Sequence, residues 1–200
     1  MEAETTGSKD GRTVRAERTR QALVDALFGL LEEGELRPTA ERIAERAGVS
    51  ERSVFQHFRD REALVEAVSH QQYERVIREV EPVDASLPLA ERLDAFVTQR
   101  ARLLEQVSPV VRAGRLFEHE SDVAAGWLTT ARSAAANEVE RVFRRELQRA
   151  EAGERAVLLA ALVSASSWAA WEGYRIHQRL GTERARAAMR TTLGALLGER

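Results

Sequence analysis

The residues of this sequence best suited to a chemical task lie between positions 52 and 57. Read as a helix, this segment puts Val54 and Phe58 one turn apart on one side, so the other side is left polar. That side carries Arg52, Ser53, Phe55, Gln56 and His57. Arginine, serine and glutamine can hydrogen-bond to base edges in the major groove, so the segment predicts a helix that reads double-stranded DNA.

The elements that must hold this segment are two short helices joined by a tight turn. Thr39 is a good N-cap for the first helix, and Gly48 can adopt the left-handed conformation that a sharp exit needs. Ser50 then caps the second helix. An apolar set could lock the pair together: Ile43, Ala44, Ala47, Val49, Val54 and Phe58. The pattern favours a DNA-binding helix-turn-helix, although an αα-hairpin of an ordinary helical bundle would share much of it.

A longer helix is expected before this pair, over residues 15–33, where apolar residues recur at helical spacing and Gly34 follows as a stop. A cluster of arginines leads into it: Arg12, Arg15, Arg18 and Arg20. Residues 1–12 are polar and contain Gly7 and Gly11, so we expect them to form a flexible arm.

The rest of the chain also predicts helices. Leu, Ala and Val dominate its apolar residues, and all four prolines precede Val110, a composition that favours long helices over strands. We therefore expect an all-α protein. The later helices are expected over 61–80, with Asp60 as N-cap, and over 89–107, 110–119, 121–150, 155–180 and 182–197.

Catalytic and metal chemistry is not indicated. The chain has no cysteine, which excludes disulfides, thiolate metal sites and a cysteine nucleophile. Its four histidines lack the H-E-x-x-H or paired-carboxylate spacing of a zinc or iron site. No G-x-S-x-G, P-loop or dinucleotide-binding glycine pattern occurs. We expect no enzyme activity, no cofactor and no bound metal.

Charge and hydropathy limit the partners and the location. The net charge of −2 argues against a protein that coats nucleic acid without sequence preference. The sequence has no uninterrupted run of about 18 apolar residues, and its first residues lack the apolar stretch of a signal peptide. We expect a soluble, cytoplasmic protein with no membrane partner.

The stretch TAERIAERAGVSERSVFQHFRDREAL, residues 39–64, closely resembles the N-terminal DNA-binding domain of the TetR family of bacterial regulators. The family's pattern reads roughly T-x-x-x-I-A-x-x-A-G-V-S-x-x-T-x-Y-x-H-F-x-x-K-x-x-L. The matching residues are Thr39, Ile43, Ala44, Ala47, Gly48, Val49, Ser50, His57, Phe58 and Leu64. Ser53 replaces the usual Thr, Arg61 the usual Lys and Phe55 the usual Tyr. Phe55 cannot donate the hydroxyl hydrogen bond to phosphate that the family's tyrosine makes, but its ring can pack on the sugar-phosphate edge.

The resemblance implies a homodimer that binds operator DNA and responds to a small-molecule effector of unknown identity. It divides the chain into the arm over 1–12, a helix-turn-helix domain over 13–60 and a ligand-binding and dimerization domain over 61–200. The implied DNA-binding residues are Thr39, Ser50, Arg52, Ser53, Phe55, Gln56, His57 and Arg61. Among them we expect Arg52 to meet a base edge and Arg61 a phosphate.

In the family the effector pocket lies between the middle helices and the penultimate one. The residues that we nominate for it are Phe96, Gln99, Leu103, Arg112, Phe117, Trp127, Ser164, Trp168 and Trp171, with Arg100 and His119 as further polar anchors. Aromatic residues at helical spacing can equally be core. Trp127 stands out because its neighbours Ala124, Ala125 and Gly126 are small and leave room beside the ring.

The last two predicted helices carry an apolar stripe rich in small residues, which permits close packing across a two-fold axis. It comprises Leu158, Leu162, Ala165, Ala169, Ile176, Ala187, Ala188, Leu193, Leu196 and Leu197. The same stripe could pack within one chain. The favoured function is a repressor released from its operator by an effector. The alternatives are a ligand-independent regulator or an activator and, from another class, a small helical enzyme.

Overall fold

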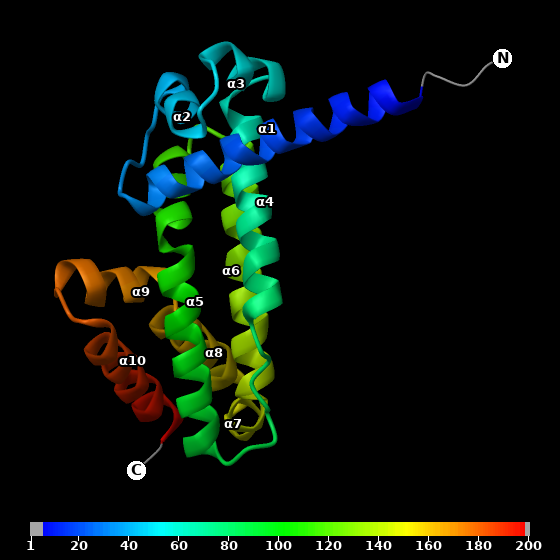
Figure 1. Cartoon of the computed structure of the whole chain (residues 1–200). Coiled ribbons are helices and arrows are strands. Elements are labelled where there is room, and N and C mark those ends of the chain that lie inside the picture. The colour runs from blue at the N-terminus through cyan, green and yellow to red at the C-terminus, as the bar shows by residue number, and fades with distance from the viewer. Residues whose placement is uncertain (1–5, 199–200) are drawn as a thin grey trace. The chain divides into compact units, whose positions relative to one another are not determined.

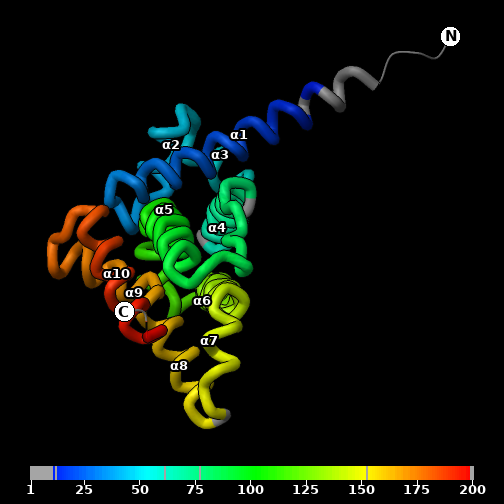
Figure 2. The backbone as a smooth tube through the Cα atoms, turned by 90° about the horizontal axis from the view of Figure 1, so that it is seen from below, coloured from blue at the N-terminus to red at the C-terminus, as the bar shows by residue number. Residues whose placement is uncertain are grey.

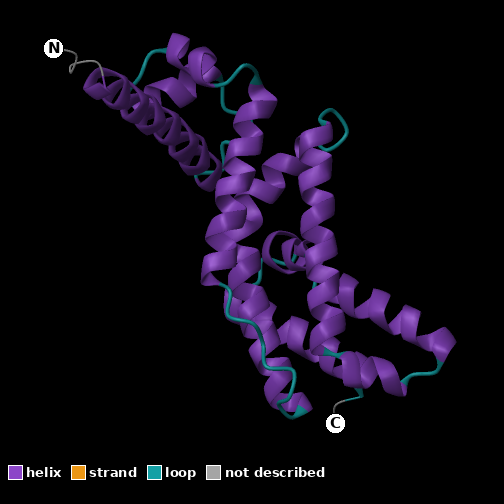
Figure 3. Ribbon diagram, turned by 90° about the vertical axis from the view of Figure 1, so that its right-hand side faces the viewer, coloured by secondary structure: helices purple, strands orange, loops and turns teal. Residues whose placement is uncertain are grey.

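The computed structural model describes residues 6–198, and every element that these residues form is helical (Figure 1, Figure 3). This confirms the all-α expectation. Within this range no single helix is both long and apolar enough to cross a membrane, although the bent pair Gly153–Ala165 and Trp168–His177 meets that test when joined. In chain order the elements are α1 (Thr6–Glu32), α2 (Ala40–Ala47), α3 (Glu51–His57), α4 (Arg61–Glu79), α5 (Leu89–Phe117), α6 (Asp122–Val142), α7 (Arg144–Arg149), α8 (Ala152–Ala165), α9 (Trp168–Glu172), a π-helical turn (Gly173–His177) and α10 (Thr182–Leu197).

The described residues form two compact units. The N-terminal unit comprises the residues up to Glu74 together with the segment Pro109–Leu128. The C-terminal unit comprises Arg75–Ser108 and the residues from Thr129 onward. The N-terminal unit thus extends beyond the helix-turn-helix domain expected over 13–60, because residues of α4 and of the segment Pro109–Leu128 supply part of its core.

The core of the N-terminal unit joins one apolar face from each of its helices. Its buried members are Leu23, Val24, Ala26, Leu27, Leu30 and Leu31 of α1, Ile43 and Ala44 of α2, Val54 and Phe58 in and after α3, Leu64 and Val68 of α4, and Val110 and Ala113 of α5. Ala47 and Val49 pack against this cluster and are partly buried. The six residues expected to lock the helix pair together therefore all do so, and their burial from water stabilises the turn between the helices.

The first helix is longer than expected. α1 begins at Thr6, whereas the sequence predicts a start near residue 15. Residues 6–12, which belong to the expected arm, are helical, and the flexibility of that arm stays a prediction. No proline interrupts the sequence before the buried turns of α1, so a helix nucleated there can propagate through Gly11 and Gly7 toward the N-terminus. Residues 1–5 lie outside the described part of the chain.

The core of the C-terminal unit contains two arginines paired with carboxylates. Arg92, 1% exposed, donates to Glu146 at 2.5 Å, and Arg100, 2% exposed, donates to Glu138 at 2.7 Å. The Arg100 guanidinium also lies over the ring of Phe96, 4.9 Å from its centroid. Burial lowers the pKa of Arg100 below its ordinary value, and the negative charge of Glu138 opposes this shift. Arg100, expected as a polar anchor for a ligand, is thus occupied by an internal ion pair.

Pro109 does not divide two helices as the sequence predicts. α5 runs through it, so the helices expected over 89–107 and 110–119 are one element. An interior proline removes a backbone donor and normally ends or kinks a helix. Here burial on either side of it, at Leu104 and Val110, holds the chain in place, and the Ser108 hydroxyl adds a hydrogen bond to the Leu104 carbonyl at 2.6 Å.

Two other long helices are interrupted. The helix expected over 121–150 breaks at the buried Phe143, where φ is −104° and ψ 23°. The helix expected over 155–180 divides into α8, α9 and the π-helical turn. The break follows from local side-chain bonding, since the Ser166 hydroxyl donates to the Leu162 carbonyl and Ser167 caps α9 by accepting from the Ala170 N–H.

Candidate nucleic-acid interface and an apolar cavity

The turn between α2 and α3 has the geometry that the sequence predicts. The Thr39 side chain accepts a hydrogen bond from the Arg42 N–H at 3.2 Å and so caps α2. Gly48 ends the helix with φ of 68°, and the next N–H, of Val49, donates to the Ala44 carbonyl at 3.0 Å. No described atom lies within 4 Å of where a Cβ at Gly48 would be, so the left-handed backbone rather than lack of space favours glycine here.

α3 turns a polar face to solvent. Val54 and Phe58 are buried, whereas Arg52 and Gln56 are exposed and Phe55 is 61% exposed. Ser53 and His57 are half-buried. The exposed side of the helix is therefore the one that the sequence predicts. An arginine and a glutamine on one exposed helical face provide the donors and acceptors that base edges require.

Ser50 differs from the expectation in one respect. It occupies the N-cap position of α3, but its side chain makes no capping hydrogen bond to the helix. Its hydroxyl oxygen lies 2.9 Å from the Ser53 hydroxyl oxygen instead. The two hydroxyls thus stand together at the start of α3, while the backbone of the turn, with Ser53 N–H donating to the Ser50 carbonyl, fixes the start of the helix.

The arginines around the helix-turn-helix have different surroundings. Arg20 lies over the Phe58 ring, with 4.8 Å from Cζ to the centroid, so this member of the arginine cluster packs against the core. The side chains of Arg12 and Arg61 lie outside the described part of the structure. The phosphate contact expected of Arg61, the first residue of α4, therefore stays a prediction.

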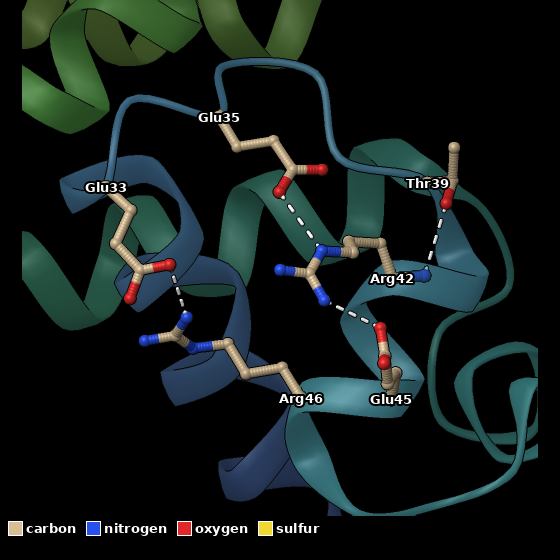
Figure 4. Close-up of polar contacts among 6 residues, drawn as sticks. All are labelled: Glu33, Glu35, Thr39, Arg42, Glu45 and Arg46. Atoms are coloured by element: carbon tan, nitrogen blue, oxygen red, sulfur yellow. Dashed lines mark hydrogen bonds and ion pairs between the residues drawn. The ribbon is translucent and has the colours of Figure 1, made fainter.

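Ion pairs join α2 to the segment that follows α1 (Figure 4). Arg46 reaches Glu33 at 2.7 Å, and Arg42 reaches Glu45 at 2.6 Å and Glu35 at 3.3 Å. The hydrogen bonds to Glu45 and then to Glu35 raise the pKa of Arg42 above its ordinary value. These two arginines therefore position α2, and Arg52 is a cation on the exposed face of α3.

An apolar cavity of about 210 Å³ lies within the N-terminal unit. Its walls come from α1, the segment 36–43, α3, α4, α5 and α6, and its aromatic lining residues are Phe55, Phe58, Phe117 and Trp127. Phe117 and Trp127 are two of the nine residues that the sequence nominates for an effector pocket. Arg112 belongs to the same unit and is half-buried, but it is not among the residues that line this cavity.

The other six nominated residues belong to the C-terminal unit: Phe96, Gln99, Leu103, Ser164, Trp168 and Trp171. Phe96 and Trp171 are fully buried core residues, and the Trp171 indole N–H donates to Glu105 at 2.7 Å. The Trp168 indole N–H donates to the Ser108 hydroxyl at 3.0 Å. Gln99 donates to the Glu81 carbonyl, Leu103 is half-buried, and Ser164 is exposed. A ligand role for these six stays a prediction.

Sequence reasoning missed most of the cavity. Leu64, Val65, Val68 and Ser69 line it from α4, and they recur at the spacing of one helical face. That periodicity was available in the sequence. What it could not supply is the partner of this face, because Val110, Ala113 and Trp127 lie more than forty residues further along the chain.

The apolar stripe predicted for the last helices is partly buried within the C-terminal unit and partly exposed to solvent. Leu162 and Leu193 are buried in the core of the C-terminal unit, and Leu158, Ala165 and Leu197 pack against that core. α10 packs against α8 and the π-helical turn (Figure 2). Exposed small or apolar residues remain on both helices: Ala156, Val157, Ala160 and Ser164 on α8, and Ala187, Thr191, Ala195 and Leu196 on α10.

Within residues 6–198 no three acidic or histidine side chains gather in the way that a metal site requires. His57 is half-buried on α3, and His119 is exposed after α5. His70 lies on the exposed side of α4, 3.8 Å from Glu74.

Comparison with known proteins supports this reading of the N-terminal unit. The family model described as bacterial regulatory proteins, tetR family, matches residues 23–68. A crystal structure of a transcriptional regulator from Rhodococcus sp. Rha1 is similar over 92% of this chain and 96% of that one, with 19% identity and a TM-score of 0.67. A protein from Mesorhizobium loti MAFF303099, assigned to the TetR family of transcriptional regulators, is similar over 92% of this chain and 97% of that one, with 18% identity and a TM-score of 0.63. No curated protein matches the chain significantly.

Proposed function

We propose that this chain is a member of the TetR family of bacterial regulatory proteins, whose family model matches residues 23–68, and that it acts as a dimeric repressor that a small molecule releases from its operator. It is a DNA-binding transcriptional regulator, and its family is not one of enzymes, so the small helical enzyme is set aside. The observation that carries the proposal is the exposed face of α3, where Arg52, Phe55 and Gln56 stand opposite the buried Val54 and Phe58. Because its partner is DNA, we place the protein in the cytoplasm.

The residues of the helix-turn-helix divide into base-reading and positioning groups. Arg52 and Gln56 carry the side chains that pair with guanine and adenine edges in the major groove. The hydroxyls of Thr39, Ser50 and Ser53 are suited to phosphate oxygens, which fix the register of a protein on the duplex without reading sequence. The Phe55 ring and His57 would lie along the sugar-phosphate edge, and Arg61 would neutralise a phosphate.

Dimerization is proposed through α8 and α10. Their exposed faces carry small or apolar side chains, including Val157, Ala160 and Ala187. Small residues allow two helices to approach closely, and two such helices from each protomer would form a four-helix bundle. A dimer also places two copies of α3 on two half-sites, which a palindromic operator requires.

The dimer interface can be tested by light scattering on a chain truncated after Gly181, which lacks α10. A monomer or an aggregate is expected. A stable dimer of the truncated chain would place the interface elsewhere. An Ala187→Glu variant tests the same face without removing a helix, because it puts a charge where two protomers would meet.

Repression is tested directly by transcription in vitro. A duplex that the wild-type protein selects from a random-sequence pool is placed across a promoter, and transcript is measured with rising protein. We expect transcript to fall with wild-type protein and to stay constant with Arg52→Ala at the same concentrations. A rise in transcript would identify an activator instead.

An effector is supported by the apolar cavity that Phe117 and Trp127 line. Native mass spectrometry of the purified protein would detect a small molecule that co-purifies with it. Trp127→Ala should weaken the response to that molecule and leave operator affinity intact. An unchanged response would remove Trp127 from the effector site.

A further inference from the structure

We propose that the cavity of the N-terminal unit binds an uncharged, mainly apolar compound of one or two rings, and that this ligand and DNA exclude each other. This inference rests on the proposed control by a small molecule. It adds the site, the chemical class of the ligand and the manner of its action.

The volume of the cavity sets the size of the ligand. An engineered apolar cavity of about 150 Å³ stays free of water and takes up benzene. The cavity here measures about 210 Å³, so a ligand somewhat larger than benzene, such as a fused two-ring compound, fits it. Phe58, Phe117 and Trp127 line the cavity, so such a ligand can contact aromatic side chains.

The lining determines that the ligand is uncharged. Among the described residues that line the cavity, Asp60 alone is ionisable. Its carboxylate already accepts a hydrogen bond from the Ala63 N–H at 2.8 Å and pairs with Arg59 at 2.9 Å. A charged ligand would lose its hydration without gaining a counter-charge, which is costly. Ser69, 4% exposed, offers a hydroxyl that one polar group of a neutral ligand could reach.

The opening of the cavity overlaps the proposed DNA interface. Three of its lining residues are exposed, namely Thr39, Phe55 and Asp60, and they mark its rim. Thr39 and Phe55 are both among the residues proposed to contact the DNA backbone. A duplex seated on α3 would therefore cover the rim, and a bound ligand that displaces the Phe55 ring would remove a DNA contact.

The ligand would also touch α3 from its buried side. Val54 and Phe58 line the cavity and are the two side chains that fix the orientation of α3. A ligand that binds more tightly to one orientation shifts the helix toward it. By reciprocity, the ligand must weaken DNA binding by the same factor by which DNA weakens ligand binding.

The test uses 1-fluoronaphthalene as probe, followed by ¹⁹F NMR on the full chain. Two variants fill the cavity. Gly114→Leu adds a Cβ that would meet Leu128 only at an ordinary 3.9 Å and continues into the lined space, and Val65→Phe enlarges a half-buried lining residue. The matched control is Gly11→Leu on α1, at an exposed helical glycine of the same unit that has open space around its Cβ and does not line the cavity.

We expect saturable binding to the wild type, unchanged binding to Gly11→Leu, and affinity lower by about tenfold or more in both cavity-filling variants. Equal binding to all four proteins, or no saturable binding to the wild type, would overturn the cavity as a ligand site. Circular dichroism and thermal unfolding of each variant show that a loss of binding is not a loss of fold.

The second arm adds the selected duplex. Saturating duplex should lower probe affinity, and saturating probe should lower duplex affinity by the same factor, while a scrambled duplex at the same concentration has no effect. If the probe binds the protein equally well with and without the duplex, exclusion is wrong. The first arm contains no DNA, so a protein that binds the probe but does not repress transcription would contradict the proposed function and leave the ligand site standing.

Discussion

The two units of this protein bury different kinds of side chain. In the N-terminal unit the polar side chains buried among the described residues, Ser69 and Gln72, are uncharged, and ion pairs lie at the surface, as between Arg46 and Glu33, whose side chains are 33% and 56% exposed. In the C-terminal unit the ion pairs of Arg92 and Arg100 lie in the interior. A buried charge that loses its partner is strongly destabilising, whereas exposed pairs contribute little. The C-terminal unit therefore depends on a few long-range polar pairs, and the N-terminal unit depends on caps, a turn and apolar packing.

The largest expected effect is on the C-terminal unit. Glu138→Gln leaves the Arg100 guanidinium charged, buried and without its carboxylate, and should lower the free energy of unfolding by about 3–5 kcal/mol. Urea denaturation measures it. Glu183→Gln is the control, since it removes the partner of Arg186 in an exposed pair of the same unit. The double variant Arg100→Met/Glu138→Met should recover most of the loss, and equal effects of Glu138→Gln and Glu183→Gln would contradict the comparison.

The next largest effect is expected at the turn between α2 and α3 in the N-terminal unit. Gly48→Val places a β-branched residue at φ of 68°, and such strain costs about 1–3 kcal/mol. We expect DNA affinity in a gel-shift assay to be lost, because α3 is no longer held at its angle to α2, and the dimer to survive. Gly48→Asn, which tolerates the left-handed region, should retain most of the affinity. Similar affinities for the valine and asparagine variants would show that the backbone conformation at Gly48 is not what binding requires.

A smaller effect on stability is expected to distinguish the two predicted N-cap residues, Thr39 and Ser50. Thr39 accepts a hydrogen bond from a helical N–H, whereas Ser50 makes none, so Thr39→Ala should cost about 1 kcal/mol and Ser50→Ala clearly less. Thermal unfolding of the free protein measures both. The assignment of capping roles would be wrong if Ser50→Ala were the more destabilising of the two.

The smallest effect is expected at the surface of the N-terminal unit. Arg46→Met removes the exposed pair with Glu33 and keeps the apolar stem, so the free energy of unfolding should fall by less than about 1 kcal/mol. The difference from wild type should shrink further at high salt. A loss as large as that of Glu138→Gln would abolish the contrast between the two units.

The sequence predicts the parts of the fold that are fixed locally. Thr39, Gly48 and Asp60 act within four residues of their partners, so their caps and turn are found where the pattern puts them. The pairs of Arg92 with Glu146 and Arg100 with Glu138 join residues 54 and 38 positions apart, and no local pattern indicates them. Pro109 leads to a wrong prediction of two helices for the same reason, because distant packing overrides its local tendency to end a helix.

The candidate site likewise has one part that local sequence predicts and one part that it does not. The exposed face of α3 follows from the spacing of Val54 and Phe58 alone. The cavity needs α4 and the segment Pro109–Leu128 to meet, and only Phe117 and Trp127 of its lining were nominated from the sequence.

The central claim, that α3 reads DNA through Arg52, is tested most directly by the affinity of Arg52→Ala and Arg61→Ala for selected and scrambled duplexes across a salt series. A bidentate arginine contact to guanine contributes about 1–3 kcal/mol of discrimination, so Arg52→Ala should lose affinity for the selected duplex and bind the scrambled one almost as wild type does. Arg61→Ala should weaken both and flatten the salt dependence by about one unit of slope per contact, or about two for a dimer. If instead Arg52→Ala lowers both affinities equally and Arg61→Ala alters only sequence preference, α3 does not present Arg52 to the bases.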